Sequence, residues 1–204
     1  MPRTGARGGP QTRAKISAVA TRLFLERGFD TVTVTEVARE AGVSAVTVFK
    51  HFPQKEDLLL DREVDAVELL RSAVRDRAPD TGVLRSLRDM AFGFLDERHS
   101  LSGLKHGSAP FFRTVAASPA LISRAREISS GLQQTLADEL ERDPAFDGDA
   151  ALLAAFFIAG YSVVLVETAR RLIAGEAADT VADEHRARLE RLFEALASGV
   201  VPQP

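Results

Sequence analysis

The 204-residue sequence contains no cysteine, and this absence excludes several kinds of chemistry. A chain without cysteine has no disulfide bond, no thiolate nucleophile and no cysteine-based zinc or iron–sulfur site. The sequence also lacks a Gly-rich phosphate-binding loop, a cluster of metal ligands at characteristic spacing, and a nucleophile paired with a base. We therefore expect no cofactor, no metal and no enzymatic activity.

Two further absences bear on location and fold. Residues 1–9 are polar and Gly-rich without an apolar segment, so they do not resemble a secretory signal, and we expect a cytoplasmic protein. No segment alternates polar and apolar residues as a half-buried strand does, which predicts an all-α fold. The uncharged stretch Ala150–Val166 is shorter than the ~20 residues of a membrane span and is closely flanked by charges. It predicts a central helix covered by protein on every side and shared between core and subunit interface.

The charges are distributed unevenly. The formal net charge is −3, but residues 1–55 carry +5 and residues 56–204 carry −8. Hydrophobic residues make up 45% of the chain, as in ordinary soluble proteins with one large or two small domains. A basic first quarter followed by an acidic body predicts that only the first segment meets a polyanion.

The first segment carries the pattern of a helix-turn-helix. Apolar residues at helical spacing predict a helix over Thr12–Arg27 that ends at Gly28. Thr33 and Glu36 form a capping-box pattern at the start of the next helix. That helix ends at Gly42, and after a short turn a third helix runs from Ser44 to Phe52, before Pro53.

The remainder of the chain predicts further helices joined by loops, with a loose Ser- and Gly-rich stretch over Ser100–Pro110. The expected helices cover Lys55–Arg77, Val83–Glu97, Phe111–Ala117, Pro119–Arg142, Asp149–Ala174 and Thr180–Ala197. We predict a disordered tail at 1–10, a three-helix DNA-binding domain at 11–55 and a larger helical domain at 56–204.

Residues 28–59 resemble the TetR family of bacterial transcriptional regulators. The matching features are Gly-Phe before the first cap, the Ala-Gly-Val-Ser turn, the Thr-x-aromatic-x-x-Phe recognition helix and Lys-Glu-x-Leu after it. Two positions depart from the family pattern. Phe49 stands where the family usually has Tyr, so one phosphate hydrogen bond per subunit is lost. Gln54 replaces the usual Ser or Asn cap.

The resemblance implies a set of DNA contacts. Thr33, Thr47, His51 and Lys55 would meet phosphates, and Thr35, Ala45, Val46 and Lys50 would face bases. Ser44 and Phe49 complete the expected DNA face, while Val48 and Phe52 point to the core. Ala45 and Val46 suit thymine methyl groups, and Lys50 can donate to guanine. Arg3, Arg7, Arg13 and Lys15 could add backbone or minor-groove contacts, although a solvated tail is the simpler interpretation of the first two.

The resemblance also implies a homodimer that reads a palindromic operator in double-stranded DNA and responds to a small effector. The two last helices would form the dimer surface, with seams such as Leu189, Leu192, Phe193 and Leu196. Intrachain core is an equal alternative for each of these residues.

The acidic body would hold the effector in an apolar, aromatic-lined cavity. The expected lining residues are Phe92, Phe94, Phe111, Phe112, Phe156 and Phe157, with His99, Gln133, Tyr161 and Glu167 as polar groups. Plain core packing is the competing interpretation of the aromatics. The implied function is a repressor released from its operator by a small apolar or aromatic effector. The alternatives are an all-α small-molecule-binding protein or enzyme using that cavity, and a nonspecific DNA-coating protein.

Overall fold

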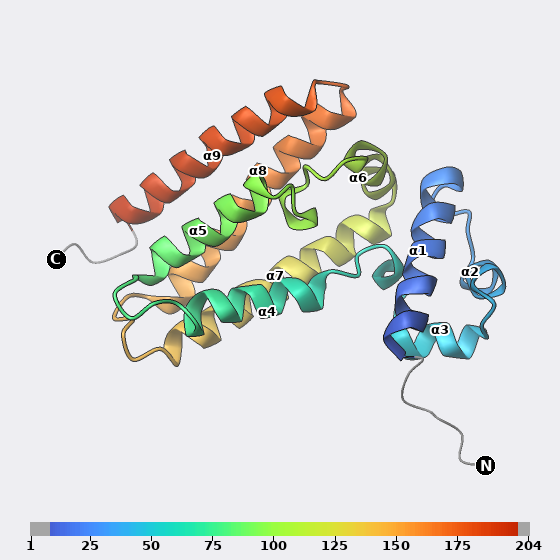
Figure 1. Ribbon diagram of the computed structural model, residues 1–204, viewed down its shortest axis with the longest axis horizontal. Coiled ribbons are helices and arrows are strands. Elements are labelled where there is room, and N and C mark those ends of the chain that lie inside the picture. Colours follow the sequence, from blue (N-terminus) through green and yellow to red (C-terminus); the bar gives the residue numbers. More distant parts are fainter. Residues whose placement is uncertain (1–8, 200–204) are drawn as a thin grey trace, which may run out of the picture. The chain divides into compact units, whose positions relative to one another are not determined.

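The computed structural model describes residues 9–199, and every regular element in that range is helical, which confirms the predicted all-α class (Figure 1). The elements are α1 (Gly9–Arg27), α2 (Val34–Ala41), α3 (Ala45–His51), the 3-10 turn η1 (Glu56–Leu58), α4 (Glu63–Arg75), α5 (Val83–Asp96), the 3-10 turn η2 (Ser100–Ser102), α6 (Ser108–Ala117), α7 (Pro119–Glu141), α8 (Ala150–Ile173) and α9 (Ala178–Gly199). Most of the predicted tail at 1–10 lies outside the described residues, but Gly9 and Pro10 are already helical.

Contacts between residues divide the chain into two compact units. The first unit runs to Asp61 and also includes Arg113–Arg124, and the second consists of Arg62–Phe112 and the chain from Ala125 onward. The division thus falls later than the predicted boundary after residue 55. One reason is that the Ser17 hydroxyl of α1 donates to the Asp61 carboxylate at 2.6 Å, which ties this segment to the first unit.

The predicted helix over Lys55–Arg77 is wrong, because η1 ends at Leu58 and α4 begins only at Glu63. Leu58 and Leu59 are buried in the first unit, whereas Val64 of the predicted seam is 70% exposed. The buried residues of α4 belong to the second unit and are Ala66, Leu70 and Val74. Apolar residues that are buried in two separate cores do not form one continuous helical stripe, and the helix is interrupted between them.

In the first unit, α1, α2 and α3 pack against one another around a small core. The predicted apolar stripe of α1 supplies the buried residues Ile16, Ala20, Leu23 and Phe24. Val48 and Phe52 contribute from α3 and the residue after it. This core holds α2 and α3, the two helices of the helix-turn-helix, against α1.

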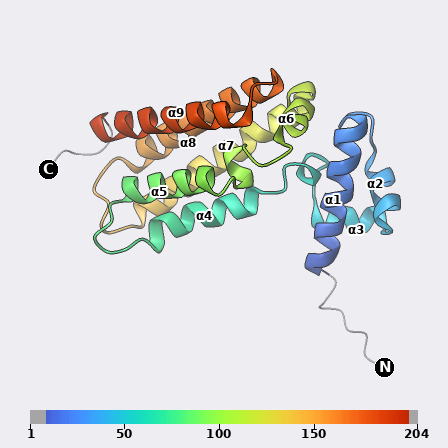
Figure 2. The same ribbon diagram turned by 45° about the horizontal axis from the view of Figure 1, so that its top comes forward.

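In the second unit, α8 and α9 lie side by side in both views (Figures 1 and 2). Gly160 permits this approach, because a Cβ atom there would lie 2.3 Å from Leu192 Cδ1. Leu189, Phe193 and Leu196 are buried within the protomer. Intrachain core therefore accounts for most of the predicted dimer seam.

The segment between α5 and α7 is more ordered than predicted. The stretch expected to be a loop contains η2 and the first turn of α6, which starts at Ser108 rather than Phe111. Gly103 adopts φ of 72°, and a Cβ atom there would lie 2.8 Å from the Phe112 ring. The close packing of this ring on the glycine backbone folds the segment over itself.

Candidate functional site

The start of α2 is held by a reciprocal pair of hydrogen bonds, as predicted. Thr33 Oγ1 accepts from the Glu36 N–H at 3.2 Å, and the Glu36 carboxylate accepts from the Thr33 N–H at 2.8 Å. The Thr33 N–H and the Arg27 guanidinium both donate to this carboxylate and lower the pKa of Glu36 to about 2. The entry to the helix-turn-helix is thereby fixed.

The turn between α2 and α3 has the geometry that its sequence predicts. Gly42 adopts φ of 66°, a left-handed conformation that favours glycine. Its N–H donates to the Arg39 carbonyl at 3.1 Å, and the Val43 N–H donates to the Ala38 carbonyl at 2.9 Å. Ser44 then caps α3, its Oγ accepting from the Thr47 N–H. The two helices form a helix-turn-helix.

The two faces of α3 differ sharply in exposure. Val48 and Phe52 are each 1% exposed, whereas Val46 is 67% and Phe49 is 50% exposed. Lys50 is also exposed. The predicted division of this helix into a core face and an outer face is confirmed, and the outer face presents two bulky apolar groups beside a cation.

The predicted phosphate-contacting hydroxyls are engaged in the caps. Thr33 Oγ1 lies 3.0 Å from the Glu36 carboxylate, and Thr47 Oγ1 lies 2.9 Å from Ser44 Oγ. His51 is half-buried, and Thr35 is exposed on the first turn of α2. These side chains therefore lie at the starts of the two helices and at the end of α3.

Lys55, which was predicted to contact a phosphate, has partners within the first unit. Its ammonium donates to the Phe29 carbonyl at 2.7 Å and lies 4.2 Å from the centroid of the Phe29 ring. Both contacts are worth most for a partly desolvated cation. The observed geometry gives Lys55 a structural role, joining the segment after α3 to the segment after α1.

Arg13 is a second basic residue that the structure turns inward. Its guanidinium donates to the carbonyls of His51 at 2.9 Å and Asp61 at 3.3 Å, and lies 4.2 Å from the Phe52 ring centroid. Lys15 is exposed, and Arg3 and Arg7 lie outside the described residues. No sequence pattern predicts this structural role of Arg13, because its hydrogen-bond partners are backbone atoms far along the chain.

The sequence model described as "Bacterial regulatory proteins, tetR family" matches residues 16–61, which include α2, α3 and most of α1. TtgW from Pseudomonas putida, an uncharacterized HTH-type transcriptional regulator, is 32% identical over 103 residues, covering 49% of this chain and 72% of TtgW. The chain belongs to the tetR family. The predicted resemblance is confirmed, and the protein is a tetR-family transcriptional regulator.

Other relatives match this chain over lengths that differ widely. The transcriptional activator FasR from Mycolicibacterium smegmatis is 24% identical over 157 residues, 75% of this chain and 69% of FasR. Several other regulators are matched over about half of their length or less. Two solved structures share the fold. NalD, a repressor from Pseudomonas aeruginosa, has a TM-score of 0.57 at 20% identity over 96% of this chain and 98% of its own. SmeT, in complex with triclosan, has a TM-score of 0.62 at 18% identity over 95% and 98%.

Several of the predicted effector-binding aromatics pack against each other in the tetR-family body. The Phe157 ring, 2% exposed, lies 5.9 Å from Phe193 and 6.0 Å from Tyr161. Phe92 lies 6.3 Å from Phe193, and Phe111 lies 5.5 Å from Phe112. Core packing accounts for these contacts, and none of these rings lines either of the two best-formed pockets among the described residues.

The predicted polar groups have partners within the protomer or lie on its surface. The Tyr161 hydroxyl donates to the Leu101 carbonyl at 3.1 Å, and burial raises its pKa. The His99 ring stacks on Phe94 with centroids 4.9 Å apart, and its Nδ1 accepts from the Leu101 N–H. Glu167 pairs with two arginines of α8 and α9, Arg170 and Arg188, and Gln133 is exposed.

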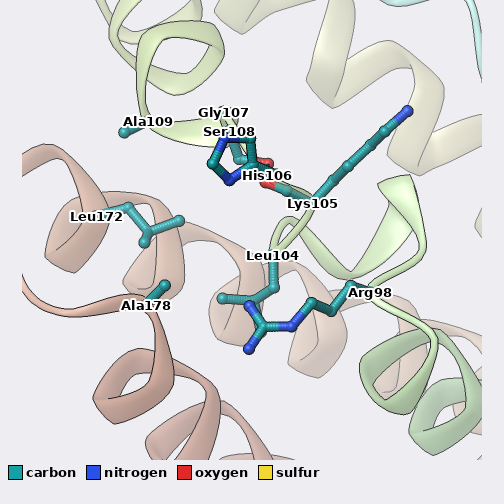
Figure 3. Close-up of a pocket in the computed structure, with 9 residues that line it drawn as sticks. All are labelled: Arg98, Leu104, Lys105, His106, Gly107, Ser108, Ala109, Leu172 and Ala178. Carbon is teal, nitrogen blue, oxygen red and sulfur yellow. The ribbon is translucent and has the colours of Figure 1, made fainter.

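The larger pocket has a volume of about 400 Å³ and lies between the segment before α6, the end of α8 and the start of α9 (Figure 3). Its lining residues are Arg98, Leu104, Lys105, His106, Gly107, Ser108, Ala109, Leu172 and Ala178. None of these residues was predicted as a ligand contact. The sequence feature that could have indicated this pocket is the basic group inside the Ser- and Gly-rich stretch.

α8 is the one helix within residues 9–199 that is long and apolar enough to cross a membrane, and 28% of its most apolar window is buried. The helix is therefore partly exposed in the protomer, and its predicted share in a subunit interface stays a prediction. Its exposed bulky apolar residues recur at helical spacing and are Leu152, Phe156, Val163 and Val166. No cluster of possible metal ligands occurs among the residues that the structure describes.

Proposed function

We propose that this protein is a cytoplasmic, homodimeric repressor that binds a palindromic operator in double-stranded DNA and is released by a small effector. The observation that carries the proposal is the capped helix-turn-helix, whose second helix turns Val46, Phe49 and Lys50 outward from a buried core. This geometry suits a helix that enters a major groove.

In this proposal the outer face of α3 reads bases. Lys50 donates to guanine, while Ala45 and Val46 contact thymine methyl groups, with Thr35 beside them. Ser44, Thr47, Thr33 and His51 position the two helices on the phosphates. Phe49 adds apolar contact but no phosphate hydrogen bond. Lys55 acts indirectly, because its bond to the Phe29 carbonyl holds the segment that follows α3 in place.

The exposed face of α8 supports the proposed dimer. A single helix-turn-helix contacts too few base pairs for specific binding, and two-fold related copies would read half-sites about 34–36 Å apart or a multiple of this distance. The exposed apolar stripe of α8 defined above is the surface that a second copy would cover.

The segment around the α6–α7 junction offers a route from effector to DNA. α6 starts in the second unit and ends in the first, where the Ser118 hydroxyl donates to the Asp30 carboxylate at 3.0 Å. Further along, Arg124 and Asp57 form an ion pair at 2.9 Å that is largely buried. An effector that moves α6 would shift residues that are bonded to the helix-turn-helix.

The first test is selection of bound fragments from a random duplex DNA pool with the full chain, at two salt concentrations. We expect one enriched palindrome, and Lys50→Ala should relax the preference at the guanine position by about 1–3 kcal/mol. Arg85→Ala, at an exposed basic residue of α5 in the second unit, is the matched control and should leave the sequence preference unchanged. Weak binding that salt abolishes, without a palindrome, would refute the proposal and favour a small-molecule-binding protein.

The direction of regulation requires a second measurement, because FasR is an activator and NalD is a repressor. Expression of a reporter gene placed behind the selected palindrome should be repressed by the wild-type chain and restored when Lys50→Ala replaces it. Increased expression with the wild-type chain would instead identify an activator.

A further inference from the structure

The pocket in front of α6 combines positive charge with apolar walls. Two of its lining residues, Arg98 and Lys105, are cations, His106 adds ring nitrogens, and none of its lining residues is acidic. The pocket also includes Ser108 and Ala109 of the first turn of α6, whose helix dipole adds partial positive charge at this end. Leu104, Leu172 and Ala178 supply apolar surface.

The close-up shows how these groups are arranged (Figure 3). The Arg98 guanidinium extends below Leu104 toward Ala178, and the His106 ring lies on the opposite side, above Leu172. Lys105 extends in the other direction, away from both. Arg98 and His106 therefore flank the apolar wall, whereas Lys105 contributes its charge from a distance.

Arg98 has spare hydrogen-bonding capacity and an unusual backbone. One of its terminal nitrogens pairs with Asp179 at 2.7 Å, and Asp179 is 90% exposed. A guanidinium has five N–H donors, so the remaining ones can still bind an oxyanion. Arg98 also has φ of 49°, and no other residue except glycine has a positive φ within residues 9–199. Such strain persists where the surroundings hold a residue in place.

We propose that this pocket binds an amphipathic organic anion, a carboxylate on an apolar body. The carboxylate lies between the Arg98 guanidinium and the first turn of α6, with His106 as a further donor. The apolar body lies against Leu104, Leu172 and Ala178. This site rests on the proposed function, in which the second unit takes a small effector, and it defines the chemical class of that effector. A volume of about 400 Å³ lies within the usual range for small-molecule sites.

The choice of a carboxylate over a neutral ligand follows from the charges. A neutral apolar molecule in this pocket would leave the Arg98 donors without a matched acceptor, whereas a carboxylate can accept two of them in parallel. A ligand that binds at the start of α6 also acts on this helix as a whole, and the other end of α6 belongs to the first unit. The same contact can therefore bind the ligand and bias the helix-turn-helix.

The test is calorimetric titration of the full-length protein, without DNA, with sodium octanoate and with octan-1-ol, which has the same chain length but no charge. We expect octanoate to bind at least about tenfold more tightly than the alcohol, as charge-assisted hydrogen bonds require. Equal affinity of the two compounds, or no octanoate binding, would overturn the proposal.

Variants localise the site. Arg98→Asn keeps a residue that tolerates the left-handed backbone, and together with His106→Gln it should weaken octanoate binding about tenfold or more. Arg85→Gln is the matched control, since it removes one arginine charge from an exposed position of α5 that does not line the pocket, and it should change affinity less than about twofold. Asp179→Asn frees Arg98 and should strengthen binding about two- to fivefold. Equal losses in Arg85→Gln and Arg98→Asn would show nonspecific charge attraction and reject the site.

The outcome for this site can be separated from the outcome for the proposed function. Binding of octanoate that depends on Arg98 but leaves operator affinity unchanged would support the site and refute effector release through it. Selection of a palindrome by a chain that does not bind octanoate would support the regulator and refute this site. Circular dichroism of each variant confirms that it is folded.

Discussion

The helix caps of the first unit and the buried ion pair of the second unit differ in the range over which polar groups find their partners. In the helix-turn-helix, the decisive bonds are local, because Thr33 meets Glu36 and Ser44 meets Thr47 three residues away. In the second unit, Glu139 of α7 is 4% exposed and accepts two hydrogen bonds from Arg75 of α4, at 2.6 and 2.7 Å. The starts of α2 and α3 are thus specified by short sequence patterns, and the second unit by packing between distant helices.

The largest expected effect contrasts two neighbouring phenylalanines of α8. Phe157→Ala should destabilise the second unit by about 3–5 kcal/mol, because its ring is 2% exposed and removal leaves a cavity. Phe156 is 48% exposed, so Phe156→Ala should leave protomer stability nearly unchanged and weaken dimerisation instead. Urea unfolding followed by the fluorescence of Tyr161, the only tyrosine in a chain without tryptophan, reports on this unit.

A Phe157→Ala variant with wild-type stability but without effector binding would contradict the interpretation of Phe157 as core. Sedimentation of Phe156→Ala over a range of concentrations provides the complementary measurement. A dimer of undiminished affinity would show that the exposed stripe of α8 is not the subunit interface.

The second effect is a loss of stability in mild acid that is confined to the second unit. His185 is 1% exposed, and burial, followed by the nearby Arg186, lowers its pKa from 6.5 to about 4. Below pH 6.5 the unfolded chain takes up a proton that the folded chain refuses, so stability falls as the pH drops toward 4. The shift corresponds to about 3 kcal/mol.

The measurement is urea unfolding by tyrosine fluorescence at several pH values between 7 and 4, compared with His185→Gln. Thr168 Oγ1 donates to the Val164 carbonyl and lies 2.8 Å from His185 Nδ1, which therefore carries the proton, while no hydrogen-bond partner for Nε2 occurs in the described structure. The account is supported if His185→Gln removes the pH dependence of the free energy of unfolding between pH 6.5 and 4. An unchanged slope would assign the acid sensitivity to other groups.

The same contrast explains which features the sequence could predict. The capping box, the Gly42 turn and the core face of α3 follow from rules that act within four or five residues, and these three features were predicted correctly. The break between Leu59 and Glu63 was missed, because whether Leu58 and Val64 share a face depends on which core buries each. The inward turns of Lys55 and Arg13 rest on backbone carbonyls 26 and 38 residues away, which no local pattern encodes.

The third effect is the loss of one helix cap in the first unit. Ser44→Ala removes the acceptor of the Thr47 N–H and should cost about 1 kcal/mol, because α3 has only 7 residues and few other bonds fix its start. Operator affinity should fall together with amide-exchange protection in α3, while the urea midpoint of the tyrosine signal stays constant. Ser44→Asp restores a cap and is the control for stability. A change in the tyrosine midpoint would show that the two units do not unfold independently.

The smallest effect is a second acid transition, confined to the first unit and at lower pH. The pKa of Glu36 is about 2 against 4.5 for an ordinary glutamate, because the Thr33 N–H and Arg27 donate to its charged form. The capping box therefore contributes its full stability above pH 4.5 and loses it as the pH falls toward 2. Amide exchange at the start of α2 should increase in this window in the wild type, and in Glu36→Gln it should be faster at neutral pH and nearly independent of pH. Because His185 titrates at higher pH, the two units should lose stability in separate steps, the second unit first. A single transition that affects both units together would mean that their electrostatics are coupled across the α6–α7 segment.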